Sequence, residues 1–443
     1  MSVERHVSHT VILRIFLTVL MMAQSIFVTR LLGPEARGLF AKLQAAQSFF
    51  ILFLGLGVTS AITYYISNRK LEHGKVLGFA FCCWLVGAGF LGLFQWLTLR
   101  VPSIDLIFPA GFSSHFYEIY FFTSFLFNSL QLVFNSALSG RQRFDMCNAM
   151  ELVVAAMRVV IFCGYFAGKF VGFYPSVHSI FLADLSLTMI RAVLFFICYR
   201  KEFGFQFLFS LKGTLRPMLG FSILIYVSYL INFLYLRADY WIIERQLGLK
   251  ELGVYSVAAG LAQFLTFIPM TLNMVMLPHL SATKETEALE RLGMFSRLNA
   301  SALMLLTSIL VFFASPVVLV CYGRAFEAAI LPLRIVSISF FMLSLKHLFA
   351  YYNLSQGRAR HNIFAELLGL SIGLSGDFLL IPRYGIVGAS YAAVAANLVS
   401  LLYVFVGIVQ GGNVRYFDLF VVDVKDLRNL VSSVLRSPAE ETL

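Results

Sequence analysis

Residues 30–38 read RLLGPEARG and residues 245–253 read RQLGLKELG, so one pattern returns after 215 positions. Both stretches follow R-x-L-G-x4-G, and in both an aliphatic, an aromatic and a small residue come next. Each stretch lies between the first and the second apolar run of its half of the chain. A pattern that recurs at one long spacing is typical of an internal repeat. The two stretches therefore predict a fold built twice from one unit.

A second pair of motifs agrees with the first. GRQR at residues 140–143 precedes Glu151, and GRAR at residues 357–360 precedes Glu366. The two glutamates are again 215 positions apart, and a small gap aligns the glycines. Each copy is predicted to contain six membrane spans. Because six is even, both copies have the same orientation, and a pseudo-two-fold axis along the membrane normal relates them.

The composition is that of a membrane protein. Hydrophobic residues make up 59% of the 443 residues and charged residues 13%, and the mean hydropathy is +0.82. A membrane-spanning helix takes about 20 apolar residues. The sequence predicts an all-α integral membrane protein with about twelve spans, near 11–32, 39–66, 77–99, 116–138, 149–170, 177–199, 218–240, 253–278, 297–320, 328–353, 363–381 and 386–410.

The predicted organisation is two six-helix lobes, at residues 1–200 and 218–410, with a cytoplasmic linker at 201–217 and a cytoplasmic tail at 411–443. If the N-terminus is cytoplasmic, the cytoplasmic loops carry nearly twice as many Lys and Arg as the outer loops, to which Lys42 is assigned. This bias predicts that both termini are cytoplasmic. It also explains the net charge of +11 without any nucleic-acid partner.

The chain lacks the sequence motifs of several enzyme classes. There is no G-x4-G-K-[ST] phosphate loop, no H-E-x-x-H and no G-x-S-x-G. The six cysteines lie in or beside predicted spans without a C-x-x-C pair, and the connections are too short for a soluble catalytic domain. The protein is therefore predicted not to be an enzyme, to need no cofactor and to contain no metal site.

Polar and charged residues within or beside the spans are the candidate site residues. An ionised group at the bilayer centre costs ~2.5–3.5 kcal/mol on the insertion scale, so such groups should face a wet cavity or pair with each other. The candidate substrate-binding residues of a central cavity are Arg14, Gln24, Glu151, Arg158, Arg191, Asp239, Lys346 and Glu366. The structural alternatives stay open: Asp184 and Arg191 as one pair, Glu366 balancing Lys346, and Arg191 reaching the cytoplasmic surface.

The order of several strings resembles a known family. They are RLLGPEARG at 30–38, SAITYYIS at 60–67, RADYWII at 237–243, PHLS at 278–281, YGRAF at 322–326 and IPRYGIVGAS at 381–390. Over about residues 10–410 the chain resembles the polysaccharide exporters of the MOP superfamily, the Wzx-type flippases. In those proteins a cationic cavity between two lobes accepts the lipid-linked substrate.

The resemblance implies a function. It implies a multi-pass protein of the bacterial inner membrane that flips a polyprenyl-pyrophosphate-linked oligosaccharide by alternating access, for O-antigen, capsule or exopolysaccharide biosynthesis. The implied partners are the lipid-linked oligosaccharide, membrane lipid, H⁺ or Na⁺ as coupling ion, and the polysaccharide polymerase machinery. The four motif glycines at 33, 38, 248 and 253 are expected in loops that shape the fold.

Three alternatives compete with this interpretation. An ion-coupled multidrug exporter of the same superfamily should have an acidic and aromatic cavity. A membrane-embedded glycan polymerase should have a large outer loop, which this chain lacks. A scaffold that transports nothing should tolerate the loss of its intramembrane charges.

Overall fold

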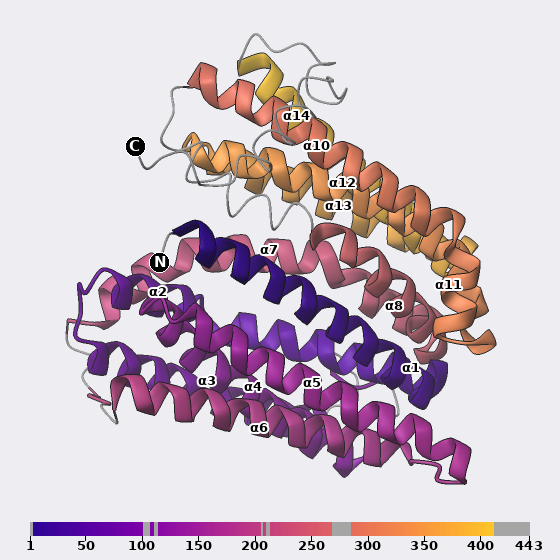
Figure 1. Ribbon diagram of the computed structural model, residues 1–443, viewed down its shortest axis with the longest axis horizontal. Coiled ribbons are helices and arrows are strands. Elements are labelled where there is room, and N and C mark those ends of the chain that lie inside the picture. The colour runs from indigo at the N-terminus through magenta and orange to yellow at the C-terminus, as the bar shows by residue number, and fades with distance from the viewer. Residues whose placement is uncertain are drawn as a thin grey trace, which may run out of the picture. The chain divides into compact units, whose positions relative to one another are not determined.

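The structure is a computed structural model that describes residues 3–100, 107–109, 114–204, 207–209, 213–267 and 285–411. In these residues all regular elements are helical (Figure 1). Their bounds are α1 Val3–Gly55, α2 Val58–Ser67, α3 His73–Arg100, α4 His115–Gly140, α5 Phe144–Gly168, α6 Val177–Phe203, α7 Leu215–Leu247, α8 Leu249–Gln263, α10 Glu285–Phe312, α11 Ala314–Cys321, α12 Ile330–Ser355, α13 Ala359–Tyr384 and α14 Ile386–Gly411. The all-α prediction is confirmed; the tail at 412–443 lies outside the described residues.

Ten helices in the described ranges are long and apolar enough to cross a membrane. The difference from twelve has two sources. Helix α1 contains the first predicted span and the start of the second, joined across a kink at Gly33, where φ is +71°. The eighth predicted span begins in α8 and continues into residues 268–284, outside the description. The ninth predicted span, 297–320, is divided between α10 and α11, and each of the remaining predicted spans corresponds to one long helix.

The kinks follow from local chemistry. Gly33 adopts a left-handed backbone conformation that L-residues rarely adopt, and Pro34 then supplies a fixed φ and no N–H donor. The second span is interrupted again before α2, at Gly57, where φ is +70°. Together these breaks divide the long apolar N-terminal segment into three helical pieces.

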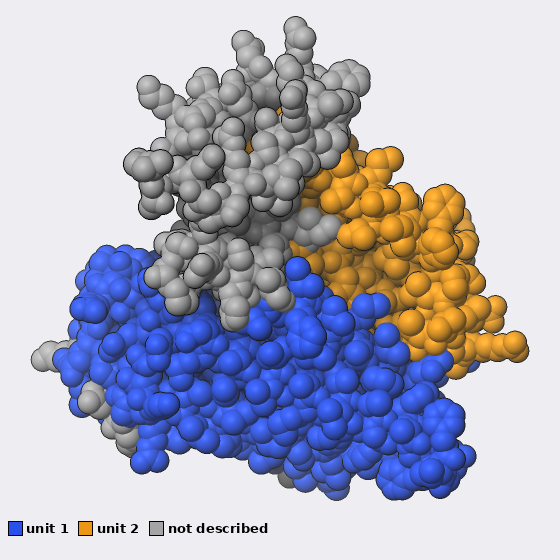
Figure 2. All heavy atoms as spheres, in the orientation of Figure 1, with its two compact units in different colours: residues 1–254 blue, residues 255–443 orange. Residues whose placement is uncertain are grey.

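The chain divides into two compact units, residues 1–254 and 255–443 (Figure 2). The first unit includes α7, which packs on α1 and α2 through aromatic rings. Phe49 of α1 lies 5.9 Å from Phe233, and Tyr64 of α2 stacks on Phe221 at 4.4 Å. The two units are defined by which residues pack together. The lobe boundaries at 200 and 218 stay a prediction.

Large apolar side chains occur on the surface as well as in the core. Val86, Val160 and Leu305 are 73%, 70% and 63% exposed, whereas Phe121, Phe162 and Leu348 are fully buried. In water such a surface would be costly, but lipid tails are as apolar as the side chains. The pattern is that of helices whose outer faces contact the bilayer.

Candidate functional site: buried ion pairs and the contact between the repeats

The two R-x-L-G-x4-G motifs pack against each other within the first unit. A Cβ added at Gly38 would lie 1.8 Å from the carbonyl oxygen of Leu249, and one added at Gly253 would lie 1.8 Å from the carbonyl oxygen of Pro34. Pro34 and Leu249 occupy equivalent positions of the repeat, so the contact is reciprocal. The two copies of the motif therefore contact each other directly within the first unit.

The structure divides the four motif glycines into two kinds. Gly33 and Gly248 have φ of +71° and +91° and break the helices, as expected of turn positions. Gly38 and Gly253, in contrast, lie inside α1 and α8, so the expectation that they occupy loops is wrong. Their lack of a side chain permits two helix backbones to touch.

A buried ion pair lies beside this contact. The ammonium of Lys42 on α1 is 2.6 Å from a carboxylate oxygen of Glu244 on α7, and the two side chains are 1% and 10% exposed. The assignment of Lys42 to an outer loop is wrong, because the residue lies in α1 four residues after Gly38. The pair links segments 202 positions apart.

Two further ion pairs form a ladder between α5 and α6. Glu151 pairs with Arg191, and seven residues further along α5, Arg158 pairs with Asp184 at 3.1 Å. Asp184 lies seven residues before Arg191, so the two antiparallel helices are in register over about 10 Å. Arg158 also donates to the hydroxyl of Thr188 at 3.1 Å. This ladder brings together three of the predicted site residues, Glu151, Arg158 and Arg191.

Helix α4 supplies a polar partner to each acidic member of the ladder. The hydroxyl of Tyr120 donates to Asp184 at 2.8 Å, and the amide of Gln131 donates to Glu151 at 3.4 Å. Two cations and two anions leave the ladder neutral. The side chains of Arg158 and Asp184 are 16% and 8% exposed, whereas those of Glu151 and Arg191 are about a quarter exposed.

The second unit contains a simpler version of the same arrangement. Lys346 on α12 lies 3.9 Å from Glu366 on α13, with side chains 2% and 17% exposed. Lys346 and Glu366 are the repeat equivalents of Gln131 and Glu151, each 215 positions later. Both copies thus retain a contact between the fourth helix and a glutamate of the fifth. This agrees with the alternative in which Glu366 balances Lys346.

The remaining predicted residues lie elsewhere. Arg14 is on α1, but its side chain lies outside the described residues. Gln24 is half-buried on α1, and the described hydrogen bonds of the ladder do not include it. Asp239 is half-buried on α7, five residues before Glu244 and beside the hydrogen-bonded residues Arg237 and Tyr240. The structure therefore brings three members of the predicted set into the ladder and two, Lys346 and Glu366, into a separate pair.

The arginines of the ladder can bind phosphate. A guanidinium holds a carboxylate or a phosphate through the same planar fork of donors. A phosphate group that approaches Arg158 or Arg191 can therefore replace the carboxylate that each arginine contacts. Removing one member of a buried pair outright is costly, about 3–5 kcal/mol. An exchange of anions keeps the arginine paired, and the displaced Asp184 still accepts the hydrogen bond of the Tyr120 hydroxyl.

Sequence reasoning missed Lys42, Glu244 and Tyr120. Lys42 lies near the start of a predicted apolar run, and a single cation in such a run indicates a residue that needs a buried partner. Glu244 and Tyr120 carried no signal of their own, because their roles depend on partners 202 and 64 positions away.

Comparison with known proteins identifies related sequences. A family model described as polysaccharide biosynthesis protein matches residues 27–331, more than half of the chain. An uncharacterised membrane protein of Methanocaldococcus jannaschii is 23% identical over 393 residues, which cover 86% of this chain and 92% of that protein. An uncharacterised membrane protein of Haemophilus influenzae is 22% identical over 260 residues, 57% of this chain and 59% of the relative.

Solved structures show the same fold at low identity. The lipid II flippase MurJ in an inward closed conformation aligns with a TM-score of 0.71 and 15% identity, over 96% of this chain and 92% of its own. An inward-facing multidrug resistance MATE family transporter of the MOP superfamily aligns with a TM-score of 0.70 and 14% identity, over 89% and 95%. A MOP superfamily transporter from Pyrococcus furiosus, described with a binding pocket of reverse polarity, has a TM-score of 0.62 and 16% identity, over 91% and 92%.

Proposed function

Because this chain belongs to the polysaccharide biosynthesis protein family, we propose that it translocates a polyprenyl-pyrophosphate-linked oligosaccharide across the bacterial cytoplasmic membrane. The fold of the MOP superfamily supports a transport protein, and transporters of repeated architecture work by alternating access to a site between their repeats. In this proposal both termini are cytoplasmic. The substrate is a unit for a cell-surface polysaccharide such as O-antigen, capsule or exopolysaccharide.

The observation that carries the proposal is the arginine ladder of the first unit. Arg158 and Arg191 are held in fixed register by α5 and α6, each against a carboxylate. Their spacing of about 10 Å along the helices places two phosphate-binding groups in one row. In the proposed mechanism the entering pyrophosphate displaces the carboxylates from these arginines. When the substrate leaves, the arginines pair with the carboxylates again. The substrate is then released without leaving an unpaired cation behind.

A double substitution tests the ladder. Arg158→Gln together with Asp184→Asn replaces the charged pair by neutral side chains of similar size and keeps the hydrogen-bonding partners of Tyr120 and Thr188. We expect membrane abundance within about twofold of wild type and a loss of polysaccharide export of at least tenfold, because the phosphate-binding fork is gone. Export is measured as surface polysaccharide per cell in a strain that lacks the native gene.

The control is the pair in the second unit, Lys346→Met with Glu366→Gln, which removes charge without removing an arginine. If the proposal is right, this variant retains more export than the ladder variant. Full export by the ladder variant would contradict a role of Arg158 in binding substrate. Arg14, Gln24 and Asp239 remain candidate cavity residues, and alanine substitutions of each belong in the same assay.

The direct test of the function is the sidedness of lipid-linked oligosaccharides in cells depleted of the protein. We expect the assembled lipid-linked unit to accumulate in the cytoplasmic leaflet, protected from a reagent added outside, within a few generations. The extract also identifies the glycan. An unchanged distribution, in a strain with no second exporter, would contradict the flippase function.

A multidrug exporter is the second candidate, because MATE transporters share the fold. Its cavity should attract cationic drugs, whereas the ladder is neutral and contains two arginines. Expression in a drug-sensitive strain separates the two functions, since only an exporter raises the inhibitory concentrations of cationic drugs. The proposal includes coupling of transport to H⁺ or Na⁺ and an interaction with the polysaccharide polymerase. Measuring transport after the H⁺ gradient or the Na⁺ gradient is collapsed identifies the coupling ion.

A further inference from the structure

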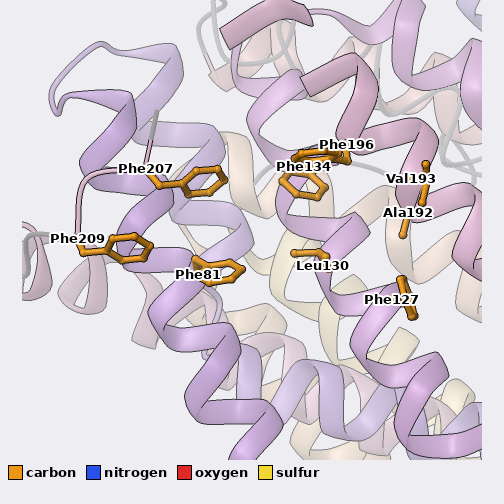
Figure 3. Close-up of a pocket in the computed structure, with 9 residues that line it drawn as sticks. All are labelled: Phe81, Phe127, Leu130, Phe134, Ala192, Val193, Phe196, Phe207 and Phe209. Atoms are coloured by element: carbon orange, nitrogen blue, oxygen red, sulfur yellow. The ribbon is translucent and has the colours of Figure 1, made fainter. Parts of the chain in front are cut away.

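An apolar cavity of about 500 Å³ lies in the first unit (Figure 3). Its walls come from α3, α4, α6 and the segment at 207–209 that follows α6. All nine lining residues are apolar, and six of them are phenylalanines: Phe81, Phe127, Phe134, Phe196, Phe207 and Phe209. The ladder uses other residues of the same helices, and Gln131 and Arg191 directly follow or precede the lining residues Leu130 and Ala192 in the chain. Pockets of this size and lining hold small apolar ligands.

Basic residues lie at one end of the helices that line the cavity. The three helices meet at Phe203, at the end of α6, whose ring lies 5.4 Å from that of His73 at the start of α3 and 4.9 Å from the guanidinium of Arg141 just after α4. The segment at 207–209 is tied to the same end, because the N–H of Leu208 donates to the carbonyl oxygen of Gly74.

The basic residues at this end, which we call the basic rim, are Lys75, Arg141, Arg143, Arg200 and Lys201. Three carboxylates lie at this end: Glu72 contacts Lys75 at 3.1 Å, Glu202 contacts Arg143 at 3.1 Å, and Asp145 lies two residues after Arg143. Arg141, Arg200 and Lys201 are exposed and leave the rim with positive charge in excess. Such a rim attracts the phosphate of a membrane lipid.

The distance between rim and cavity matches the depth of a lipid leaflet. On α4, Phe134 and Phe127 precede Arg141 by 7 and 14 residues, which corresponds to about 10 and 21 Å along the helix. Half of the hydrocarbon thickness of a bilayer is about 15 Å. A lipid whose phosphate contacts the rim would therefore place its chain alongside the phenylalanines.

We propose that this cavity binds the isoprenoid chain of a polyprenyl phosphate lipid, with its phosphate on the basic rim. The proposal rests on the proposed function, because it gives the carrier lipid a second contact with the protein. A methyl-branched isoprenoid chain is wider than a straight acyl chain and suits a wide cavity lined by aromatic rings. The site would hold the carrier at the protein before or after its headgroup enters the transport cavity.

The test uses the full-length protein in phosphatidylcholine nanodiscs and a polyprenyl monophosphate that carries a photoreactive group in its chain. We expect labelling of cavity residues on α3, α4 and α6, located by mass spectrometry. Unlabelled polyprenyl monophosphate should reduce this labelling about tenfold, and phosphatidylglycerol at the same concentration by less than twofold. Equal competition by the two lipids, or labelling spread evenly over the helix surfaces, would overturn the proposal.

Two substitutions with one matched control complete the test. Val193→Trp fills the cavity from a half-exposed position, and Val160→Trp makes the same change on α5 at a position 70% exposed and outside the cavity. Only the first should reduce labelling, by about fivefold or more. Arg141→Gln with Arg200→Gln should reduce labelling by the phosphate probe but not by the matching polyprenol, which has no charge. Equal labelling of the two tryptophan variants would overturn the site.

The outcome is separable from that of the proposed function. Labelling reports binding of the carrier, whereas the leaflet distribution of lipid-linked oligosaccharide reports flipping. Specific labelling with an unchanged leaflet distribution would retain the binding site and reject the flippase. The converse result would retain the flippase and reject the cavity as a carrier site.

Discussion

Gly38→Ala is expected to destabilise the protein by at least about 3 kcal/mol, at the upper end of the range for overpacked cores, and to abolish export. The added methyl would lie 1.8 Å from the carbonyl oxygen of Leu249, which belongs to a helix backbone and cannot rotate away. Helix propensity alone predicts the opposite, because alanine stabilises a helix by about 1 kcal/mol relative to glycine. Thermal unfolding of the detergent-solubilised protein measures the stability, and surface polysaccharide measures export.

Gly89→Ala is the matched control, because Gly89 is also helical but has open space where the methyl would go. It should leave stability unchanged or raise it. The reciprocal variant Gly253→Ala should behave like Gly38→Ala, and the double variant should cost clearly less than the two single costs added together, because both methyls open one contact. Additive costs, or a Gly38→Ala protein as stable as Gly89→Ala, would contradict the reciprocal contact.

Lys42→Met is expected to cost about 3–5 kcal/mol and to lower the amount of folded protein in the membrane severely, because the variant leaves Glu244 charged and buried. Replacing the partner as well, with Glu244→Leu, should recover most of the stability, since two apolar side chains can occupy a buried site at little or no net cost. Unfolding of the single and double variants, in a double-mutant cycle, measures the coupling.

The charge-reversed variant, Lys42→Glu with Glu244→Lys, extends this test. Partial recovery relative to either single reversal would show that the two groups interact through their charges. A double variant no more stable than Lys42→Met would instead show that Lys42 stabilises the contact through another neighbour.

The sequence identified several residues of the site, but it did not identify which residues pair with each other. The cost of charge in a membrane singled out Glu151, Arg158 and Arg191, and the structure places them in one ladder. The same reasoning offered Asp184 and Arg191 as a pair, and this is wrong. Residues seven apart lie on the same face of α6, and each finds its partner across the helix interface on α5.

The repeat also shows what a sequence pattern leaves open. The offset of 215 predicts that Glu151 and Glu366 are equivalent, and in the structure each glutamate contacts the preceding helix, Glu151 through Gln131 and Glu366 through Lys346. The second copy, however, has Gly373 and Val399 where the first has Arg158 and Asp184. The ladder is therefore an addition to one copy, which is why we place substrate binding in the first unit.

The sequence alone determined that this is an all-helical membrane protein with a duplicated six-span unit, because apolar length and fixed spacing are properties of the chain read in order. Only the tertiary structure decided that the motif glycines join the repeats, that Lys42 is buried against Glu244 across 202 positions, and that each arginine of the ladder has a carboxylate. These contacts depend on the register and rotation of packed helices. A hydrophobic run does not encode either of them, since many rotations bury the same apolar surface.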